Sequence, residues 1–275
     1  MFAYGVLHFG LCNAPAIFQR DILDIFSDLI NEGLKVYMDD FTPYGDDFER
    51  ALETLEKVLQ RCIATKLCLS HEKYHMMMTE GLILGHYISA AEIQVNPAKI
   101  EIISLIPTPT TQTEVRNFLG FSSYYGRFIE HFSQIAAPLY TLTGNVDFIW
   151  TDKCNHTFED LKRLVSTASV LRGPNWDLPF QISFDASDTA IGIVLGQEED
   201  KNPYAIYYIS KNLSPAELNY TITEKEFLAI IHAVNKFRHY ITRYHVVLYT
   251  DHSTIKYLAN KPITNGGVTR WLILL

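Results

Sequence analysis

The last third of the sequence has an order of elements that few folds accommodate. Alternating or continuous apolar patterns predict three short strands, helical spacing of large apolar residues predicts a long helix, and a final apolar run predicts a fourth strand. These five segments are residues 180–184, 190–195, 204–209, 224–241 and 246–250. The first three strands would form an antiparallel meander, and the last strand could insert beside the first.

A second pattern lies near the N-terminus, in LKVYMDDFTPY, residues 34–44. Apolar and aromatic residues flank Asp39–Asp40, which predicts a strand, a tight turn and a second strand. Asp46 then opens a predicted helix, with Glu49 completing a capping pattern. Apolar residues recur along this helix at helical spacing, at Phe48, Leu52, Leu55, Leu59 and Cys62.

Between these regions the sequence predicts short elements and a hinge. A β-prone run, a short helix, the hinge PTPTTQT and two aromatic-rich helical segments follow one another. They occupy residues 82–88, 97–106, 107–113, 114–132 and 154–166. The two later helical segments predict a small helical connector, and the whole pattern predicts an α+β protein.

Composition restricts the function classes. The chain has 275 residues and a mass of 31.5 kDa, enough for two domains or three small ones. Hydrophobic residues make up 48% and charged residues 20%, which excludes disordered, collagen-like and disulfide-dense scaffolds. A formal net charge of -8 argues mildly against a domain whose main task is binding phosphates, because such domains usually carry a basic face.

The cysteines and the N-terminus point to an intracellular protein. Cys12, Cys62, Cys68 and Cys154 form no C-x-x-C pair, so reduced thiols and a cytosolic or nuclear setting are expected. The N-terminal run lacks a basic segment and contains His8, so neither a signal peptide nor a membrane span is expected.

The paired acids Asp39–Asp40 are the first candidate site. Adjacent carboxylates on a sharp turn can both reach a divalent ion when a third carboxylate comes from elsewhere. Aspartate is also an ordinary turn residue, so a solvated turn is the simpler alternative. The apolar neighbours Val36 and Phe41 favour a functional role, because a buried unpaired charge would be costly.

Tyr44-Gly45-Asp46-Asp47 offers a competing Y-G-D-D interpretation, which resembles the metal motif of RNA-templated RNA polymerases. We reject this interpretation, because Asp46 and Asp47 lead directly into the predicted helix. Acids in a first turn cap free N–H groups and complement the helix dipole.

Asp185, Glu226 and Asp251 form the second candidate site. Two of these acids follow predicted strands, and Glu226 lies on the long helix. If the strands carrying Asp185 and Asp251 are neighbours, the three carboxylates can converge and hold two Mg²⁺ ions for phosphodiester hydrolysis. Each acid alone would more often be a surface or capping residue.

Three further groups have ordinary explanations. Cys62, Cys68, His71 and His75 have poor spacing for a structural zinc site. Tyr124, Tyr125 and Arg127 could contact a nucleic-acid strand, although aromatic residues at helical spacing are more often core. Gly10 and the Asn13–Pro15 segment could line a nucleotide pocket or form a turn.

Seven segments together resemble the Pol polyprotein of gypsy-class LTR retrotransposons, in the family's order and over essentially the whole chain. They are HFGLCNAPAIFQR (8–20), VYMDD (36–40), LGHYIS (84–89), FLGFSSYYGRFI (118–129), FDAS (184–187), LNYTITEKEFLAI (218–230) and YTDHSTIKYL (249–258). The resemblance implies the C-terminal part of a polymerase palm over residues 1–92 and a small helical thumb or connection over 93–173. It further implies an RNase H-like mixed-sheet domain, truncated at its C-terminus, over 174–275.

The resemblance also implies residue roles. Catalytic, metal-binding carboxylates would be Asp39 and Asp40 in the palm, and Asp185, Glu226 and Asp251 in the RNase H domain. Nucleotide and primer contacts would be Phe9, Gly10, Tyr37 and Met38, together with Leu84, Gly85 and His86 as the primer grip. Nucleic-acid contacts would be Tyr124, Tyr125 and Arg127.

The implied activities are RNA-directed DNA polymerisation and RNase H cleavage of the RNA strand in RNA–DNA hybrids. The implied cofactor is Mg²⁺, with Mn²⁺ as an alternative. Partners would be an RNA template, a DNA primer and an RNA–DNA hybrid, with dNTPs, protease and integrase segments in the parent polyprotein and no membrane. Cytoplasmic particles or the nucleus are the compartments expected for the family.

The ends of the chain modify these expectations. The chain starts at the family's nucleotide-loop region, so we expect the palm strand with the first catalytic aspartate to be absent and polymerisation by this chain alone to fail. The given sequence stops at Leu275, so we expect the segment in which the family places a fourth RNase H aspartate to be absent. His8 and Gly126 replace residues usual in the family, which would weaken template contacts slightly. The alternatives are a non-catalytic nucleic-acid-binding module and a relic without activity.

Overall fold

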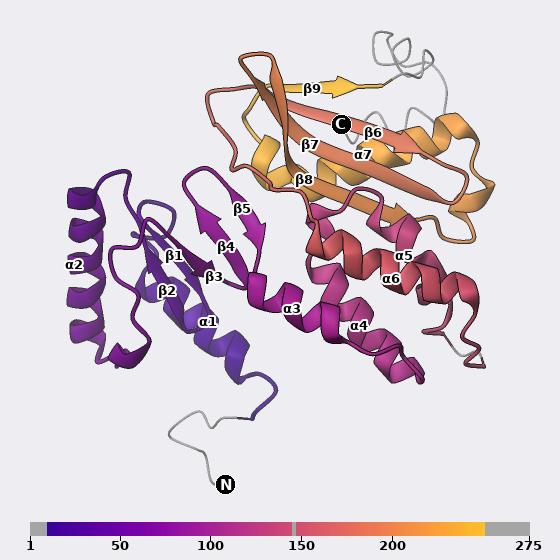
Figure 1. Cartoon of the computed structure of the whole chain (residues 1–275). Coiled ribbons are helices and arrows are strands. Elements are labelled where there is room, and N and C mark those ends of the chain that lie inside the picture. Colours follow the sequence, from indigo (N-terminus) through magenta and orange to yellow (C-terminus); the bar gives the residue numbers. More distant parts are fainter. Residues whose placement is uncertain (1–9, 145–146, 251–275) are drawn as a thin grey trace, which may run out of the picture. The chain divides into compact units, whose positions relative to one another are not determined.

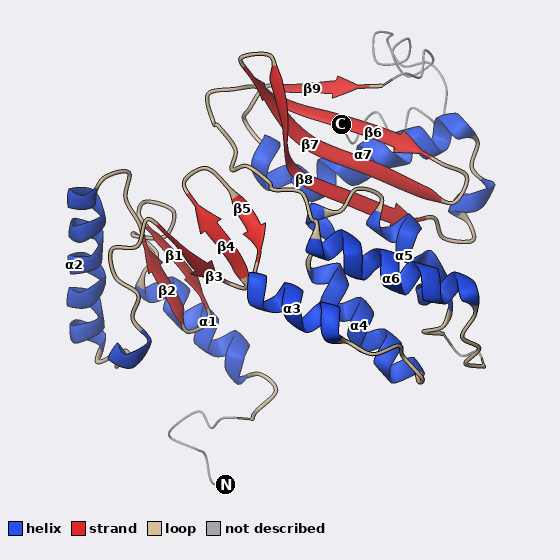
Figure 2. Ribbon diagram, in the orientation of Figure 1, coloured by secondary structure: helices blue, strands red, loops and turns tan. Residues whose placement is uncertain are grey.

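The structure is a computed structural model that describes residues 10–144 and 147–250. The chain divides into two compact units, with the boundary between Met78 and Thr79. Figure 2 shows that both units mix helices and strands, which confirms the predicted α+β class. No helix in these described ranges is both long and apolar enough to cross a membrane.

The first unit packs two helices against a hairpin. It contains α1 (Ala14–Ile25), β1 (Leu34–Tyr37), β2 (Asp40–Pro43), α2 (Phe48–Thr65) and the short 3-10 helix η1 (His71–Lys73). β1 and β2 are antiparallel, as predicted, and Tyr37 pairs directly with Asp40. The buried core of this unit consists of Ile22, Phe26, Leu34, Val58 and Cys62.

Helix α2 starts one residue later than the sequence pattern suggests. Its N-cap is Asp47, whose side chain accepts a hydrogen bond from the backbone N–H of Arg50 at 2.8 Å, so the predicted cap at Asp46 is wrong. The buried stripe is Thr54, Val58 and Cys62. Phe48, which was expected on the apolar face, is 63% exposed.

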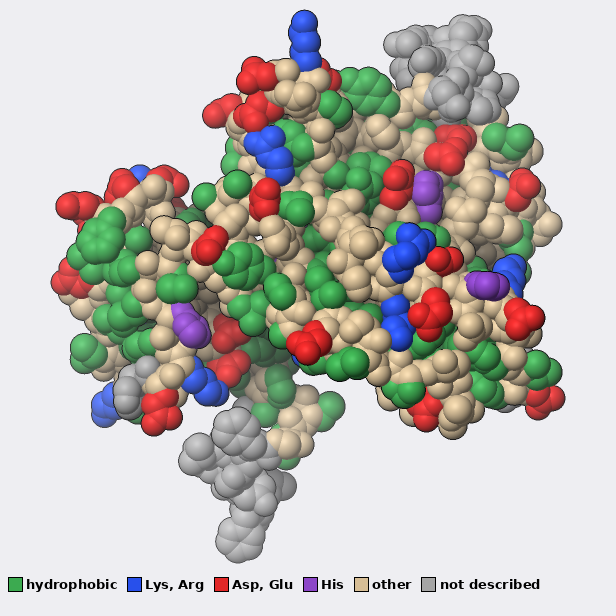
Figure 3. Space-filling view, in the orientation of Figure 1, with side chains coloured by type: hydrophobic (Ala, Val, Ile, Leu, Met, Phe, Trp, Pro, Cys, Tyr) green, Lys and Arg blue, Asp and Glu red, His purple; other side chains and the backbone are tan. Residues whose placement is uncertain are grey.

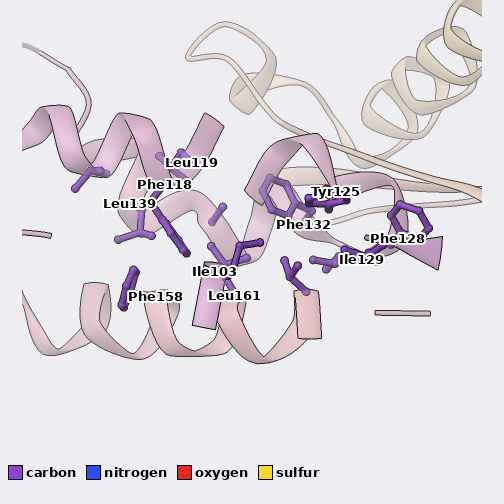
Figure 4. Close-up of a cluster of buried hydrophobic side chains, with 14 of the residues drawn as sticks. Ile103, Phe118, Leu119, Tyr125, Phe128, Ile129, Phe132, Leu139, Phe158 and Leu161 are labelled. Carbon is purple, nitrogen blue, oxygen red and sulfur yellow. The ribbon is translucent and has the colours of Figure 1, made fainter. Parts of the chain in front are cut away.

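The second unit opens with a three-stranded meander, β3 (Glu80–Ile83), β4 (His86–Ser89) and β5 (Ile93–Val95). The helices α3 (Pro97–Leu105), α4 (Gln112–Tyr124), α5 (Phe132–Thr141) and α6 (Asp152–Ser166) follow, with the 3-10 helix η2 (Gly126–Phe128) between α4 and α5. The side chains of Asn96, Thr111 and Thr151 cap α3, α4 and α6. Figure 4 shows part of the core among these helices, including Phe118, Phe158 and Leu161.

The single helical segment predicted over residues 114–132 is wrong, because α4 ends at Tyr124 and α5 begins at Phe132. The chain turns through η2, where a Cβ at Gly126 would lie 3.3 Å from the ring of Phe132. His131 then has a positive φ of 56° as the N-cap residue of α5. Tertiary packing of aromatic side chains therefore breaks a segment whose spacing alone is helical.

A four-stranded sheet completes the second unit. Its strands are β6 (Phe180–Ala186), β7 (Ala190–Glu199), β8 (Asn202–Asn212) and β9 (Val246–Tyr249), in the order β8-β7-β6-β9. The 3-10 helix η3 (Glu217–Asn219) and helix α7 (Ile222–Ile241) precede β9, and α7 lies along one face of the sheet (Figure 1). β9 pairs with β6 in parallel, which confirms that the last predicted strand inserts beside the first.

The burial pattern of β6 separates the two faces of this sheet. Phe180, Ile182 and Phe184 are buried in the core that α7 covers, and the residues between them are half-buried or exposed. A capping box at Thr221 and Glu224 fixes the start of α7. The sheet and helix therefore hold Asp185 and Glu226 on elements whose positions are well determined by packing.

Candidate nucleic-acid and metal sites

Asp39 and Asp40 lie at the tip of the β1–β2 hairpin. Met38 and Asp39 form the two-residue turn, and Met38 has a positive φ of 52°. The backbone N–H of Met38 donates to the side-chain oxygen of Gln19 on α1. This hydrogen bond ties the turn to the helix and holds a backbone conformation that a methionine rarely adopts.

Both carboxylates at this tip are exposed, as is Tyr37 at 56%. Asp39 and Asp40 therefore do not need a metal ion to offset the cost of burial, because solvent already stabilises their charges. Gly10 is exposed with a positive φ of 93°, and Phe9 lies outside the described residues. The roles predicted for these residues and for Met38 stay predictions.

The acids of the second candidate site are placed on different elements. Asp185 is an exposed residue of β6 and pairs with Gly192 on β7. Glu226 lies on α7 and is only 4% exposed. Asp251 lies outside the described residues, so the convergence of all three carboxylates stays a prediction.

A buried lysine links α7, which carries Glu226, to the turn that follows β6, the strand of Asp185. Lys225 on α7 is 6% exposed, and its ammonium group donates to the backbone carbonyl of Asp188 at 2.9 Å. Lys225 was not among the candidates predicted from the sequence. The one feature of the sequence that could have indicated Lys225 is its positive charge in the first turn of a helix, where acidic residues are expected.

Among the side chains that the structure describes, no three His, Cys, Asp or Glu groups are placed to hold a metal ion together. Cys12 and Cys68 are exposed free thiols, and Cys62 and Cys154 are buried free thiols. Burial raises the pKa of the Cys62 thiol, as expected for a core cysteine.

The predicted primer grip forms the β3–β4 hairpin turn. Leu84 and Gly85 are its two central residues, with φ values of 45° and 74°, and Ile83 pairs with His86 across it. Positive φ at both central residues is typical of a type I′ turn. His86 is 9% exposed, and burial lowers the pKa of its imidazole, which favours the neutral form.

The three predicted nucleic-acid contacts differ in accessibility. Tyr124 is 50% exposed, whereas Tyr125 is 2% exposed and packs beside Phe128 in the core (Figure 4). Arg127 places its guanidinium 4.2 Å from the centre of the Tyr207 ring on β8, a cation–π contact. The structure therefore gives Tyr125 a packing role, and nucleic-acid contact by these residues stays a prediction.

An open groove of about 440 Å³ lies beside the hairpin turn. It is lined by Gly85, Lys99, Asn117, Gly120, Phe121, Tyr124 and Tyr125. The ammonium group of Lys99 lies 5.5 Å from the centre of the Phe121 ring. Lys99 and Asn117 were not among the sequence-based candidates, because neither belongs to a recognisable motif.

Two family models match the chain. Residues 1–123 match "Reverse transcriptase (RNA-dependent DNA polymerase)", and residues 150–248 match "RNase H-like domain found in reverse transcriptase". The first match includes the Asp39–Asp40 hairpin and the β3–β4 turn, and the second includes β6, β7, β8 and α7 and ends within β9.

Curated relatives support the same assignment. The retrovirus-related Pol polyproteins from transposons opus and 297 of Drosophila melanogaster are each 34% identical, over 96% and 100% of this chain. The Tf2-3 transposon polyprotein of Schizosaccharomyces pombe is 29% identical over 100% of this chain. The chain spans 28%, 26% and 21% of the lengths of these curated relatives.

Solved structures share the fold. The foamy viral protease-reverse transcriptase in complex with double-stranded DNA superimposes with a TM-score of 0.80, at 23% identity, covering 96% of this chain and 47% of that chain. The same viral protein with an RNA/DNA hybrid gives a TM-score of 0.79 at 23% identity, covering 98% and 37%.

The fold and the two matched regions define a reverse transcriptase segment joined to an RNase H-like domain. The chain belongs to the retrovirus-related Pol polyproteins of gypsy-class LTR retrotransposons. Reverse transcriptase and RNase H families generally use divalent metal ions.

Proposed function

We propose that this chain forms part of an RNA-directed DNA polymerase with ribonuclease H activity, and that its own RNase H-like domain cleaves the RNA strand of RNA–DNA hybrids. The observation that carries the proposal is the sheet order β8-β7-β6-β9 with β6 and β9 in parallel. This order gives Asp185 a neighbouring strand from which a second carboxylate can come.

The register of β6 and β9 supports Asp251 as that second carboxylate. Ser183 pairs with Tyr249, and both Asp185 and Asp251 come two positions later along the sequence. Glu226 would supply the third carboxylate from the first turns of α7, which Lys225 ties to the turn after β6. DNA polymerisation from dNTPs would be an activity of the parent polyprotein. The protease and integrase segments would also be parts of that polyprotein.

Mg²⁺ fits the donor chemistry of both candidate sites, with Mn²⁺ as the alternative. Asp39, Asp40 and Asp185 offer exposed carboxylate oxygens, the ligands that Mg²⁺ prefers. When bound, the ions would activate a nucleophile and stabilise the leaving oxygen. The protein's own part is to hold these carboxylates at a hairpin tip and a strand end, and to position the nucleic acid against them.

Nucleic-acid binding would rest on local features of the surface. On the face that Figure 3 shows, Lys and Arg side chains are scattered among acidic ones. The relevant partners are an RNA template, a DNA primer and their hybrid. The two foamy viral structures hold double-stranded DNA and an RNA/DNA hybrid, which supports these partners by analogy of fold.

A labelled RNA–DNA hybrid incubated with the purified chain and Mg²⁺ tests the proposal. We expect RNA cleavage that requires Mg²⁺ and is lost in Asp185→Asn, while Asp177→Asn, an exposed acid of the same domain, retains it. Any primer extension should disappear in Asp39→Asn and persist in Asp46→Asn. Cleavage that survives Asp185→Asn would contradict the assignment of the site.

Hybrid binding without catalysis is the second candidate. The observation in its favour is that Glu226 is only 4% exposed whereas Asp185 is exposed, so these two carboxylates differ in their access to a solvated ion. It predicts hybrid binding without Mg²⁺ that survives Asp185→Asn and weakens as salt rises. If the chain cleaves no RNA but binds the hybrid in this way, hybrid binding without catalysis is its function.

A further inference from the structure

We propose that Tyr124 and Tyr125 are positioning residues whose two hydroxyl groups fix the Leu84–Gly85 turn in the conformation that a primer–template duplex requires. The proposal rests on the proposed function for the role of the turn, and on the structure for the clamp itself. It differs from the expectation that these tyrosines stack on nucleic acid.

The turn needs external support because of its first central residue. Leu84 has a φ of 45°, a conformation that costs a residue with a branched side chain about 1 kcal/mol or more. Leu84 is also 43% exposed, so its own side chain gains little burial to offset that cost. Contacts from elsewhere in the fold must therefore hold this conformation.

Two successive hydroxyl groups supply those contacts. Tyr124 Oη donates to the carbonyl of Leu84, and Tyr125 Oη donates to the carbonyl of Gly85 at 3.1 Å. Both central carbonyls of the turn are thus bound by the end of α4, 40 residues further along the chain.

Ring packing fixes the hydroxyl groups in turn. The rings of Tyr124 and Tyr125 are 5.1 Å apart in an edge-to-face arrangement, and the His86 ring lies 5.1 Å from the first and 5.7 Å from the second. His86 Nδ1 is 3.0 Å from the Leu84 carbonyl oxygen, so the neutral ring with a proton on Nδ1 donates a further hydrogen bond to it.

The fit at Gly85 shows how closely α4 approaches the turn. A Cβ on Gly85 would lie 3.3 Å from Tyr124 Oη, and its φ of 74° suits glycine. Gly85, Tyr124 and Tyr125 also line the open groove beside the turn. The clamp therefore shapes a surface that a nucleic-acid strand can reach.

Tyr→Phe substitutions separate positioning from stacking, because phenylalanine keeps the ring and loses only the hydroxyl. We expect Tyr124→Phe/Tyr125→Phe to weaken binding of a primer–template duplex roughly three- to tenfold, measured by fluorescence anisotropy without Mg²⁺. Hydrogen exchange in the peptide covering residues 80–89 should accelerate. Tyr140→Phe on α5 is the matched control and should change neither measurement.

Leu84→Asn should stabilise the turn when the tyrosine hydroxyl groups are absent. Asn-Gly is the dipeptide that most favours a type I′ turn, so a turn that starts with asparagine keeps its conformation without the hydroxyl groups. Adding Leu84→Asn to the double Phe variant should restore the protection of residues 80–89 from hydrogen exchange. A hydroxyl that contacts nucleic acid directly would not be replaced in this way.

The outcomes are distinct. Unchanged hydrogen exchange of residues 80–89 in the double Phe variant would overturn the proposal, as would faster exchange that Leu84→Asn fails to slow. If the unmodified chain binds no primer–template, the proposed function is contradicted, and faster exchange in the double Phe variant with rescue by Leu84→Asn would still establish the clamp.

Discussion

The ammonium group of Lys225 donates to the backbone carbonyl of Asp188 at 2.9 Å, from a side chain that is only 6% exposed. This hydrogen bond joins the first turn of α7 to the turn that follows β6. It therefore connects the two segments that carry Glu226 and Asp185, and a change at Lys225 should affect both.

Replacing Lys225 by methionine should destabilise the protein. Methionine matches the length of the lysine stem but cannot donate a hydrogen bond, so the Asp188 carbonyl loses its partner at about 1–2 kcal/mol. Urea unfolding should show the lower stability. Lys236→Met, at an exposed position of the same helix, is the control, and equal effects from both would contradict a specific role for Lys225.

His86 should make the stability depend on pH. Burial lowers its pKa from 6.5, so as the pH falls the unfolded chain binds this proton before the folded protein does. The free energy of unfolding should therefore decrease as the pH falls below about 6.5, until the folded pKa is reached, and His86 should contribute no slope above that range.

His232 is half-buried and its pKa is also lowered by burial, so the contribution of His86 must be measured as a difference. We expect His86→Phe to flatten part of the decline in urea-unfolding free energy between pH 7.5 and pH 5.5. An identical slope in the variant would show that His86 does not cause it.

Glu217 should stabilise the protein down to strongly acidic pH. Burial alone would raise the pKa of this carboxyl, but hydrogen bonds from Lys211, at 2.5 Å, and from the backbone of Ser214 lower it from 4.5 to about 2. A lowered pKa gives stability that is complete above about 4.5 and is lost as the pH falls towards 2.

Glu217→Gln tests this ion pair. We expect it to lower the free energy of unfolding by about 1 kcal/mol at neutral pH, because the ion pair is partly exposed. The stability difference from the unmodified chain should shrink in thermal unfolding experiments as the pH falls through this window. A difference that stays constant with pH would exclude the ion pair as its cause.

Gly192 should not tolerate a side chain while His131 is present. A Cβ at Gly192 would lie 2.6 Å from His131 Nδ1, so Gly192→Ala must displace the imidazole, at about 1–3 kcal/mol. His131→Gly removes the ring and suits the positive φ at that position. The double variant should therefore recover most of the loss in a double-mutant cycle.

Gly120→Ala is the control for this cycle, because a Cβ at Gly120 on α4 would meet no atom within 4 Å. An alanine there should stabilise the helix slightly. Additive losses from Gly192→Ala and His131→Gly would show that the two residues do not interact.

The helices and strands that could be predicted are those whose apolar residues recur at a regular local spacing. Period-two alternation located β6 and β8, and the order of strands and helix predicted that β9 lies beside β6. The cap of α2 was misplaced because Asp46 and Asp47 are equally suitable by type. The break between α4 and α5 was missed because the packing of Gly126 against Phe132 leaves no trace in helical spacing.

Some features of the candidate sites could likewise be predicted from local sequence, and others depend on tertiary structure. The turn at Asp39–Asp40 follows from its flanking strands, whereas the exposure of its acids depends on tertiary structure. The hydrogen bonds from Tyr124 and Tyr125 to the Leu84–Gly85 turn join segments 40 residues apart. A single sequence contains no local signal for such a pairing, so these tyrosines could only be interpreted as stacking or core residues.

The parallel pairing of β6 with β9 has a consequence for how the chain folds during synthesis. β6 can form a hairpin with β7 as soon as both have been made, but its other edge has to wait for α7 and β9. Such non-local pairings form late, and an open edge can pair with other chains in the meantime. The strand that carries Asp185 therefore has an edge that other chains can pair with until Val246–Tyr249 emerges from the ribosome.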